Sequence, residues 1–138
     1  MANPNIVNVT TINGTTAYVL PASTAVSVAW TYADPNTSGS VSLTGLTPAS
    51  GTVNKINNIV VTNVDGSAAA DVTIEYNTLA AGTGTPYRLA STISVPADAS
   101  LIVTDKSTSF YLEENTSLKG FASANSDIEV FVSYEVLS

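Results

Sequence analysis

Apolar and polar residues alternate along much of the chain with the period of two that is typical of β-strands. In residues 71–76, Val72, Ile74 and Tyr76 alternate with polar positions. Residues 128–137 extend the pattern, with one row predicted for the core (Ile128, Val130, Val132, Tyr134, Val136) and one for the outside (Glu129, Phe131, Ser133, Glu135, Leu137). Both stretches are predicted to be strands that bury one face.

Residues 55–77 are predicted to form a central antiparallel pair, because two apolar runs flank Asp65-Gly66, a dipeptide that favours turns. In the first run the apolar residues fall on both parities, with Ile56, Val60 and Val64 on one and Ile59 and Val61 on the other. This arrangement suits a strand covered on both faces, by a second sheet or by a neighbouring subunit. Ile59 and Val61 are therefore candidate interface residues.

Further short strands are predicted at 6–12, 16–20, 25–31, 41–43, 87–93, 101–104, 110–113 and 118–124. Asn13-Gly14 favours a hairpin between the first two of these strands. Trp30 lies on the inward parity of 25–31 and is expected in the core. No stretch shows a sustained period of 3.6 residues, so little or no helix is expected.

These elements predict an all-β protein in which residues 1–138 form a single domain. The expected architecture is an antiparallel β-sandwich of roughly 8 to 10 strands, jelly-roll or Ig-like in topology. Residues 1–5 are interrupted by Pro4 and are predicted to be a frayed tail or an N-terminal arm that lies on a neighbour.

Outward aromatic residues are candidates for contacts with other subunits. Phe131 and Leu137 lie on the outer row of the last strand. If the alternate residues of the preceding strand, 118–124, point inward, Phe121 shares that outer face. Exposed aromatics would indicate an interface, although an incorrect sheet assignment would place both phenylalanines in the core.

Charged residues make up 11% of the chain against roughly 25% in an ordinary soluble domain, and Ser, Thr and Asn fill the polar positions. Such groups cost less to bury than Lys or Glu, which favours contact with other protein copies, although a Thr-rich β protein would look the same. Residues 34–40 read as a loop that begins with Asp34, Pro35 and Asn36, and these three residues are further candidates for a subunit contact.

The charge pattern disfavours two classes of partner. Lys and Arg number 4 against 11 Asp and Glu, giving a formal charge of −7, and the basic residues are scattered, so no nucleic-acid partner is expected. No apolar run approaches the roughly 20 residues that span a bilayer, so no membrane partner is expected. The first residues lack the features of a secretory signal, and we expect the chain to be made and kept in a cytoplasm, or packed inside something assembled there.

The sequence contains no His and no Cys, which removes Ser-His-Asp and Cys-His catalysis and the usual zinc sites. Acid–base chemistry would need paired carboxylates, but the glutamates are expected at outward or turn positions, where they act as solubilising charge. Asp65, Ser67 and Asp71 could offer oxygen ligands to calcium, yet they lack the acidic density of a known loop. We expect no enzyme activity, no cofactor and no metal.

A carbohydrate-binding adhesion module is an alternative from a different class of function. It would need an exposed aromatic platform beside polar loop groups. Trp30 and the six Tyr fall mostly on inward parities, which disfavours this alternative.

Four stretches carry a resemblance to a known family: KINNIVVTNVDGSAAADVTIEY, YRLASTISVPADASLIV, YLEENTSLKGFASANSD and IEVFVSYEVLS. Together they resemble small β-rich virion proteins of tailed bacteriophages, particularly phages of marine and freshwater cyanobacteria. The similarity runs from about Lys55 to Ser138. It implies a structural protein on the capsid surface, most simply a decoration or cement protein, with a tail, collar or fibre component as the alternative. The implied partners are copies of itself and the major capsid protein, in a homo-oligomer made in the host bacterial cytoplasm.

Overall fold

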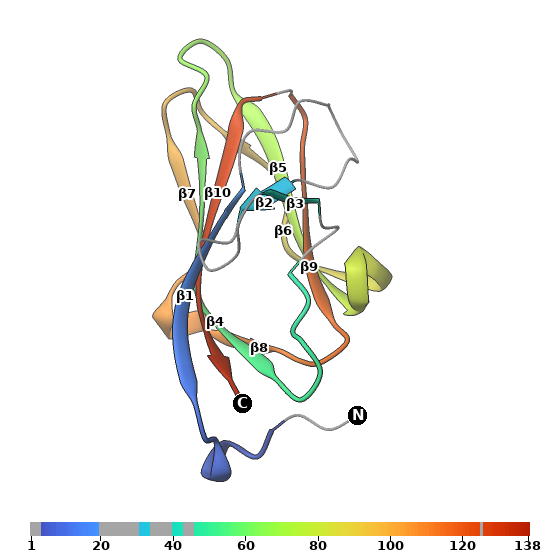
Figure 1. Cartoon of the computed structure of the whole chain (residues 1–138). Helices are drawn as coiled ribbons and strands as arrows, with labels where there is room; N and C mark the ends of the chain where they lie inside the picture. Colours follow the sequence, from blue (N-terminus) through green and yellow to red (C-terminus); the bar gives the residue numbers. More distant parts are fainter. Residues whose placement is uncertain (1–3, 20–30, 34–39, 43–45, 125) are drawn as a thin grey trace.

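A computed structural model describes residues 4–19, 31–33, 40–42, 46–124 and 126–138 of the chain (Figure 1). The described residues form ten strands in two antiparallel sheets that pack against each other, which confirms the predicted β-sandwich. Within them helix is limited to three 3-10 turns, which lie at Ile6–Asn8, Ala80–Gly82 and Lys106–Thr108.

The larger sheet contains seven strands in the order β3-β2-β1-β10-β4-β7, and β8 also pairs with β4. Their bounds are β1 Ile12–Val19, β2 Thr31–Ala33, β3 Ser40–Ser42, β4 Val53–Asn63, β7 Ser100–Thr104, β8 Phe110–Leu112 and β10 Ile128–Leu137. The smaller sheet has the order β6-β5-β9, with β5 Ala70–Leu79, β6 Thr83–Val95 and β9 Ser117–Ala122.

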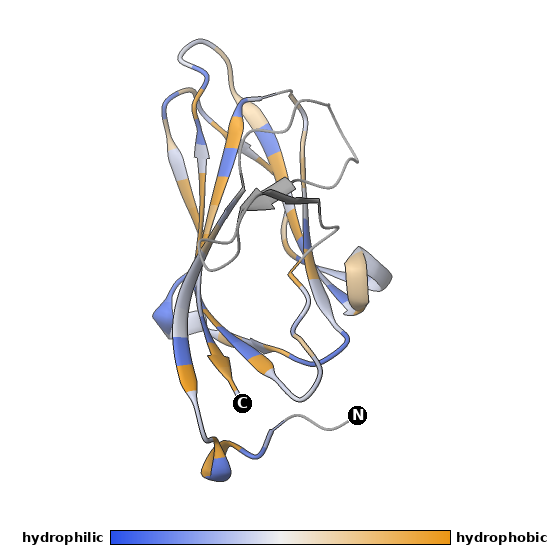
Figure 2. Ribbon diagram, viewed as in Figure 1, coloured by the Kyte–Doolittle hydropathy of each residue, from blue (hydrophilic) through white to orange (hydrophobic). Residues whose placement is uncertain are grey.

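The core lies between the two sheets and takes side chains from both. Most of the residues predicted for it are buried, namely Val72, Ile74, Ile128, Val130, Val132 and Tyr134, and Val136 is half-buried. Tyr76 is half-buried and packs edge-on against Phe110, with 6.3 Å between ring centroids. Burying one large aliphatic side chain contributes about 1.5–3 kcal/mol, so this shared core is the main source of cohesion between the sheets. The alternation of hydrophobic and hydrophilic residues is visible along β10 in Figure 2.

The predicted central pair is wrong, because β4 and β5 belong to different sheets. β4 pairs with β10, β7 and β8, whereas β5 pairs with β6 and β9, so neither strand has an edge left for the other. Residues 64–69 cross from one sheet to the other, a separation of about 10 Å in stacked sheets. The two apolar runs therefore face each other across the core.

Asn63 holds the corner at which the chain changes sheet. Its side chain is fully buried, and its Nδ2 donates to the carbonyl oxygens of Ala68 and Val95, both at 2.9 Å. Its Oδ1 accepts the backbone N–H of Asp65 at 3.0 Å. The Asn63 amide thus forms hydrogen bonds with three backbone groups at the corner, where the strand-to-strand hydrogen bonds of the sheet end.

A β-bulge explains the apolar residues on both parities of β4. Ser133 of β10 faces Asn58 and Tyr134 faces Ile56, so Asn57 is an extra residue in β4. One extra residue moves the inward position by one, because the side-chain period is two. Ile56 is therefore buried on one side of the bulge, and Ile59 and Val61 on the other. Within the described residues the smaller sheet covers one face of β4, and cover of the other face by a neighbouring subunit stays a prediction.

The predicted hairpin at Asn13-Gly14 is also wrong, since β1 runs through these residues as one strand. Every residue of β1 faces a residue of β10, with Gly14 opposite Glu135. A turn there would leave part of the β10 edge unpaired, and this long ladder outweighs the local turn preference. Of the proposed N-terminal arm, residues 1–3 lie outside the described residues, and Asn5 caps the first 3-10 turn by accepting the Val7 N–H.

Candidate functional site

Four apolar side chains form a continuous line across the outer face of the larger sheet. Tyr18 of β1 faces Phe131 of β10, Phe131 faces Val60 of β4, and Val60 faces Ile102 of β7. We call these residues the apolar row. Neighbouring strands lie about 4.8 Å apart, so the row is about 14 Å long.

The apolar row points away from the core. Tyr18, Phe131 and Ile102 are 40%, 50% and 63% exposed, and Val60 is half-buried. The residues on either side of Phe131 and Val60 along their strands are buried inward: Val130 and Val132, and Ile59 and Val61. A line of adjacent exposed apolar residues differs from the scattered ones that any monomer has, and it is typical of interaction sites.

Polar residues frame the apolar row on both sides. On one side Glu129 faces Thr62 and Thr62 faces Ser100, with the two hydroxyls 2.8 Å apart in a hydrogen bond. On the other side Ser133 faces Thr16 and Asn58. An apolar centre with a polar, mostly uncharged rim is the usual anatomy of a protein–protein contact.

One predicted interface residue, Phe131, is exposed as expected, whereas Ile59, Val61 and Leu137 are not. Ile59 and Val61 are buried in the core at 1% and 0% exposure, because the bulge in β4 turns both inward. Leu137 is 5% exposed and lies opposite the buried Val53 at the end of the sheet. The assignment of these three residues to an interface is therefore wrong.

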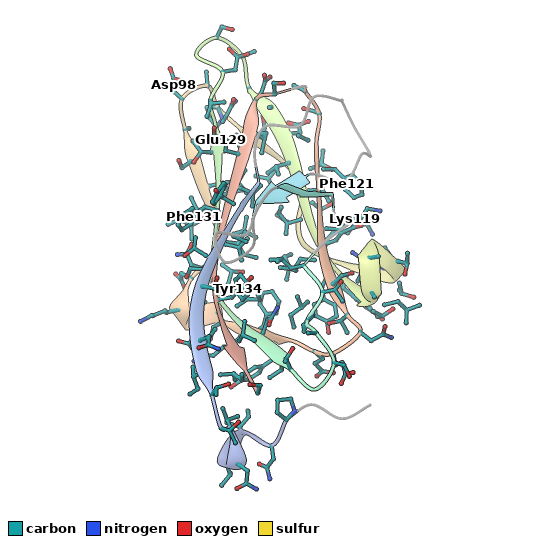
Figure 3. The ribbon with its side chains drawn as sticks, in the orientation of Figure 1. Asp98, Lys119, Phe121, Glu129, Phe131 and Tyr134 are labelled. Atoms are coloured by element: carbon teal, nitrogen blue, oxygen red, sulfur yellow. The ribbon has the colours of Figure 1, made fainter. Side chains whose placement is uncertain are left out.

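Phe121 lies on the opposite side of the molecule from Phe131 (Figure 3). It belongs to β9 in the smaller sheet, and the alternate residues of that strand, Leu118, Gly120 and Ala122, are buried as expected. The ring is half-buried, and the Lys119 ammonium lies 4.7 Å from its centroid. The expectation that both phenylalanines share one face is wrong because their strands belong to different sheets.

Several earlier expectations fall on residues that the structure does not describe. Asp34, Pro35 and Asn36 lie outside the described residues, and so does Trp30. Tyr18, Tyr87 and Tyr111 are exposed, so the expected inward placement of most tyrosines is wrong for these three.

Sequence reasoning missed three members of the apolar row, Tyr18, Val60 and Ile102. A usable signal exists for two of them. Val60 is flanked by Ile59 and Val61, and Ile102 by Leu101 and Val103. Where three apolar residues follow one another in a strand, the middle one must face away from its neighbours. Their alignment with Phe131 depends on cross-strand register, which periodicity alone does not contain.

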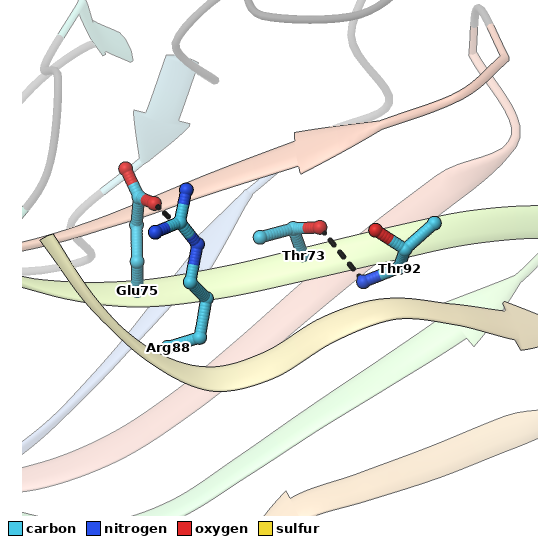
Figure 4. Close-up of polar contacts among 4 residues, drawn as sticks. All are labelled: Thr73, Glu75, Arg88 and Thr92. Atoms are coloured by element: carbon cyan, nitrogen blue, oxygen red, sulfur yellow. Dashed lines mark hydrogen bonds and ion pairs between the residues drawn. The ribbon is translucent and has the colours of Figure 1, made fainter.

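The outer face of the smaller sheet has a hollow of about 380 Å³ lined by Thr73, Glu75, Pro86, Arg88, Ser91, Thr92 and Phe121. The Glu75 side chain is only 5% exposed, and its Oε2 lies 3.6 Å from Nε of Arg88 (Figure 4). Beside this pair the Thr92 N–H donates to the Thr73 hydroxyl at 3.0 Å. The expectation that the glutamates are exposed solubilising charge is therefore wrong for Glu75.

The proposed calcium ligand Asp65 is engaged in its own turn. Its Oδ1 accepts both the N–H and the hydroxyl of Ser67, at 2.8 and 2.7 Å, and these hydrogen bonds lower the pKa of the Asp65 carboxyl. Asp105 and Ser107 repeat the arrangement, which lowers the pKa of Asp105 in the same way. Among the described residues no group of three or more Asp and Glu is placed to hold a metal ion.

Comparison with protein-family models, with curated proteins and with solved structures gives no match in any of the three searches. In the part of the chain that the structure describes, no helix has the length and apolar character needed to cross a membrane.

Proposed function

We propose that the chain is a non-enzymatic structural protein of a virus particle, a capsid decoration or cement protein that acts through contacts between subunits. The apolar row on the outer face of the larger sheet is the observation that carries this proposal. The proposed partners are further copies of the chain and the major capsid protein, and the proposed location is the capsid surface.

The apolar row has the composition of an interface centre. Aromatic residues are enriched at such centres, and Tyr18 and Phe131 lie directly opposite each other on neighbouring strands. Each large side chain that a contact removes fully from water contributes about 1.5–3 kcal/mol. In a symmetric assembly this gain is repeated in every subunit.

The rows beside the apolar row suit the same role. A standard interface buries about 800 Å² on each partner, more than the row alone offers, so the flanking hydroxyl and amide groups would belong to the same contact. The Lys55–Glu135 pair, with 3.9 Å between Nζ and Oε2, lies further along the same face and is exposed. A pair of this kind contributes little energy but favours one orientation of the partner.

The resemblance of residues 55–138 to phage virion proteins supports the choice of a capsid over other assemblies. The test is to purify virus particles by density gradient from an infected host culture that expresses the chain. The amount of the chain in the particles is then quantified by mass spectrometry. A fixed ratio of the chain to the major capsid protein, retained through the gradient, is expected. Presence only in the soluble lysate would contradict the proposal, and enrichment in isolated tails would replace the capsid by the tail as its location.

A further inference from the structure

We propose that the hollow on the outer face of the smaller sheet is a binding site for a neutral polyhydroxylated ligand, a saccharide unit. The site lies on the opposite side of the sandwich from the apolar row and does not depend on the proposed assembly. Its volume of about 380 Å³ falls at the small end of ligand pockets, which suits one or two sugar rings better than a long chain.

Glu75 carries carboxylate oxygens that face the hollow and are paired with Arg88. Its side chain is 5% exposed, and among the described residues it forms an ion pair with Arg88, with 3.6 Å between Oε2 and Nε. An ionised carboxylate has about four lone-pair positions, so most of this capacity is open to a ligand. Vicinal hydroxyls of a sugar are donors that match two carboxylate oxygens.

Arg88 makes the site electrically balanced. It faces Glu75 on the neighbouring strand and, at 52% exposure of its side chain, keeps guanidinium donors accessible to a ligand. Within the lining the charges of Glu75 and Arg88 cancel, and the remaining polar residues carry hydroxyls. An anionic ligand would meet the Glu75 carboxylate, so the charge balance favours a neutral one.

Phe121 provides an apolar wall for the hollow. The C–H face of a pyranose packs against an aromatic ring, while its hydroxyls reach polar groups beside the ring. The Lys119 ammonium, 4.7 Å from the ring centroid, holds the ring in place without lining the hollow itself. The acceptor, the donor and the ring thus come from three adjacent strands, β5, β6 and β9.

A β-bulge gives the hollow its shape. Val72 faces Ile93 and Ile74 faces Ala90, so Ser91 and Thr92 together oppose the single residue Thr73. Thr92 has a φ of 49°, an unfavourable conformation for a β-branched residue, and its N–H is held by the Thr73 hydroxyl. Bulges and strained residues of this kind are over-represented at binding sites, where they redirect side chains.

The test is an NMR titration of the ¹⁵N-labelled chain with glucose, galactose, mannose and N-acetylglucosamine, and separately with inorganic phosphate. At least one sugar is expected to shift the backbone signals of Thr73, Ser91 and Thr92 in a saturable way, with a Kd on the order of 1–10 mM. Saturable shifts at these positions with phosphate and none with sugars would overturn the proposal in favour of an anion site. The absence of saturable shifts with every probe would also overturn it.

Matched variants test the assigned residues. Glu75→Gln keeps the size of the side chain but removes its charge, and it is expected to weaken sugar binding about tenfold. Phe121→Ala should weaken it further, and Arg88→Lys, which keeps the charge but loses the guanidinium, should also weaken it. Because the Arg88 side chain is 52% exposed, this variant keeps the test valid if a substitution at Glu75 or Phe121 unfolds the chain. Phe131→Ser, on the opposite face, should leave it unchanged. Sugar binding that survives Glu75→Gln and Arg88→Lys unaltered would refute the assignment, whatever the outcome for assembly.

Discussion

Replacing Phe131 by Ser should weaken assembly while leaving the fold intact. The side chain is 50% exposed in the isolated subunit. A phenylalanine presents roughly 200 Å² in total, so about 100 Å² remains for a partner to cover. At about 25 cal/mol per Å² this area contributes about 2.5 kcal/mol per copy. In a two-fold contact that includes both copies, the loss of about 5 kcal/mol weakens association roughly 10³–10⁴-fold.

Sedimentation velocity over a range of protein concentrations measures this effect. The parent chain should associate, and Phe131→Ser should remain monomeric at concentrations where the parent is assembled. Phe121→Ser is the matched control, because it makes the same chemical change on the opposite face. An outward Phe→Ser change in a strand alters folding stability by about 1 kcal/mol or less, so both variants should unfold near the parent in urea.

The same experiment can refute the reasoning. If Phe131→Ser sediments like the parent at every concentration, the apolar row is not the contact. If Phe121→Ser abolishes association and Phe131→Ser does not, the contact lies on the smaller sheet instead.

Three further predictions concern the corner, the turns and metal ions. Replacing Asn63 by Leu leaves two carbonyls and one N–H without partners, and urea unfolding should show a loss of about 2 kcal/mol or more, whereas a loss under 0.5 kcal/mol would contradict the role of the corner. Because the pKa values of Asp65 and Asp105 are lowered below 3.8 in the folded chain, their stabilising contribution is complete above the unfolded value and is lost as the pH falls through the folded one. The double variant Asp65→Asn, Asp105→Asn should therefore lose less melting temperature than the parent between pH 4 and pH 2, and parallel curves would contradict this. Treatment with a chelator should leave the melting temperature unchanged. A drop of several degrees that added calcium reverses would instead indicate a calcium site at Asp65 and Asp71.

The strands with clean alternation could be predicted from the sequence, because a period of two depends only on local backbone geometry. The last strand was predicted at residues 128–137, and β10 has the same bounds. Its inner row is buried through Tyr134, and Phe131 is exposed as expected. In β9 the predicted inward residues are likewise buried.

Strand pairing could not be predicted in the same way, because the partners of each strand depend on the relative stability of all possible pairings along the chain. Asp65-Gly66 favours a turn locally, but both flanking strands find longer ladders elsewhere, and Asn63 stabilises the crossing. The turn preference of Asn13-Gly14 is outweighed by the continuous ladder between β1 and β10. Local turn preferences are weaker than a complete set of backbone hydrogen bonds.

The candidate sites depend on register and were only partly predictable. Phe131 could be named from its own strand, but the apolar row exists only because Tyr18, Val60 and Ile102 align with it across three pairings. Glu75 is polar and lies at an outward position, so the sequence indicated an exposed residue. Its burial follows from Arg88 on the adjacent strand and from the bulge opposite Thr73.

Oxidative footprinting of exposed side chains tests the central claim most directly, because it reads the apolar row itself in the assembled state. Hydroxyl radicals would be applied to the assembled chain and to the same chain diluted until it is monomeric, and the oxidation of Phe131 and Tyr18 would be quantified by mass spectrometry. Both residues should be protected on assembly, while Tyr87, 62% exposed on the smaller sheet, should react equally in the two states. Equal oxidation of Phe131 and Tyr18 in both states would contradict the account. A chain that remains monomeric at every concentration and does not bind to particles would contradict it as well.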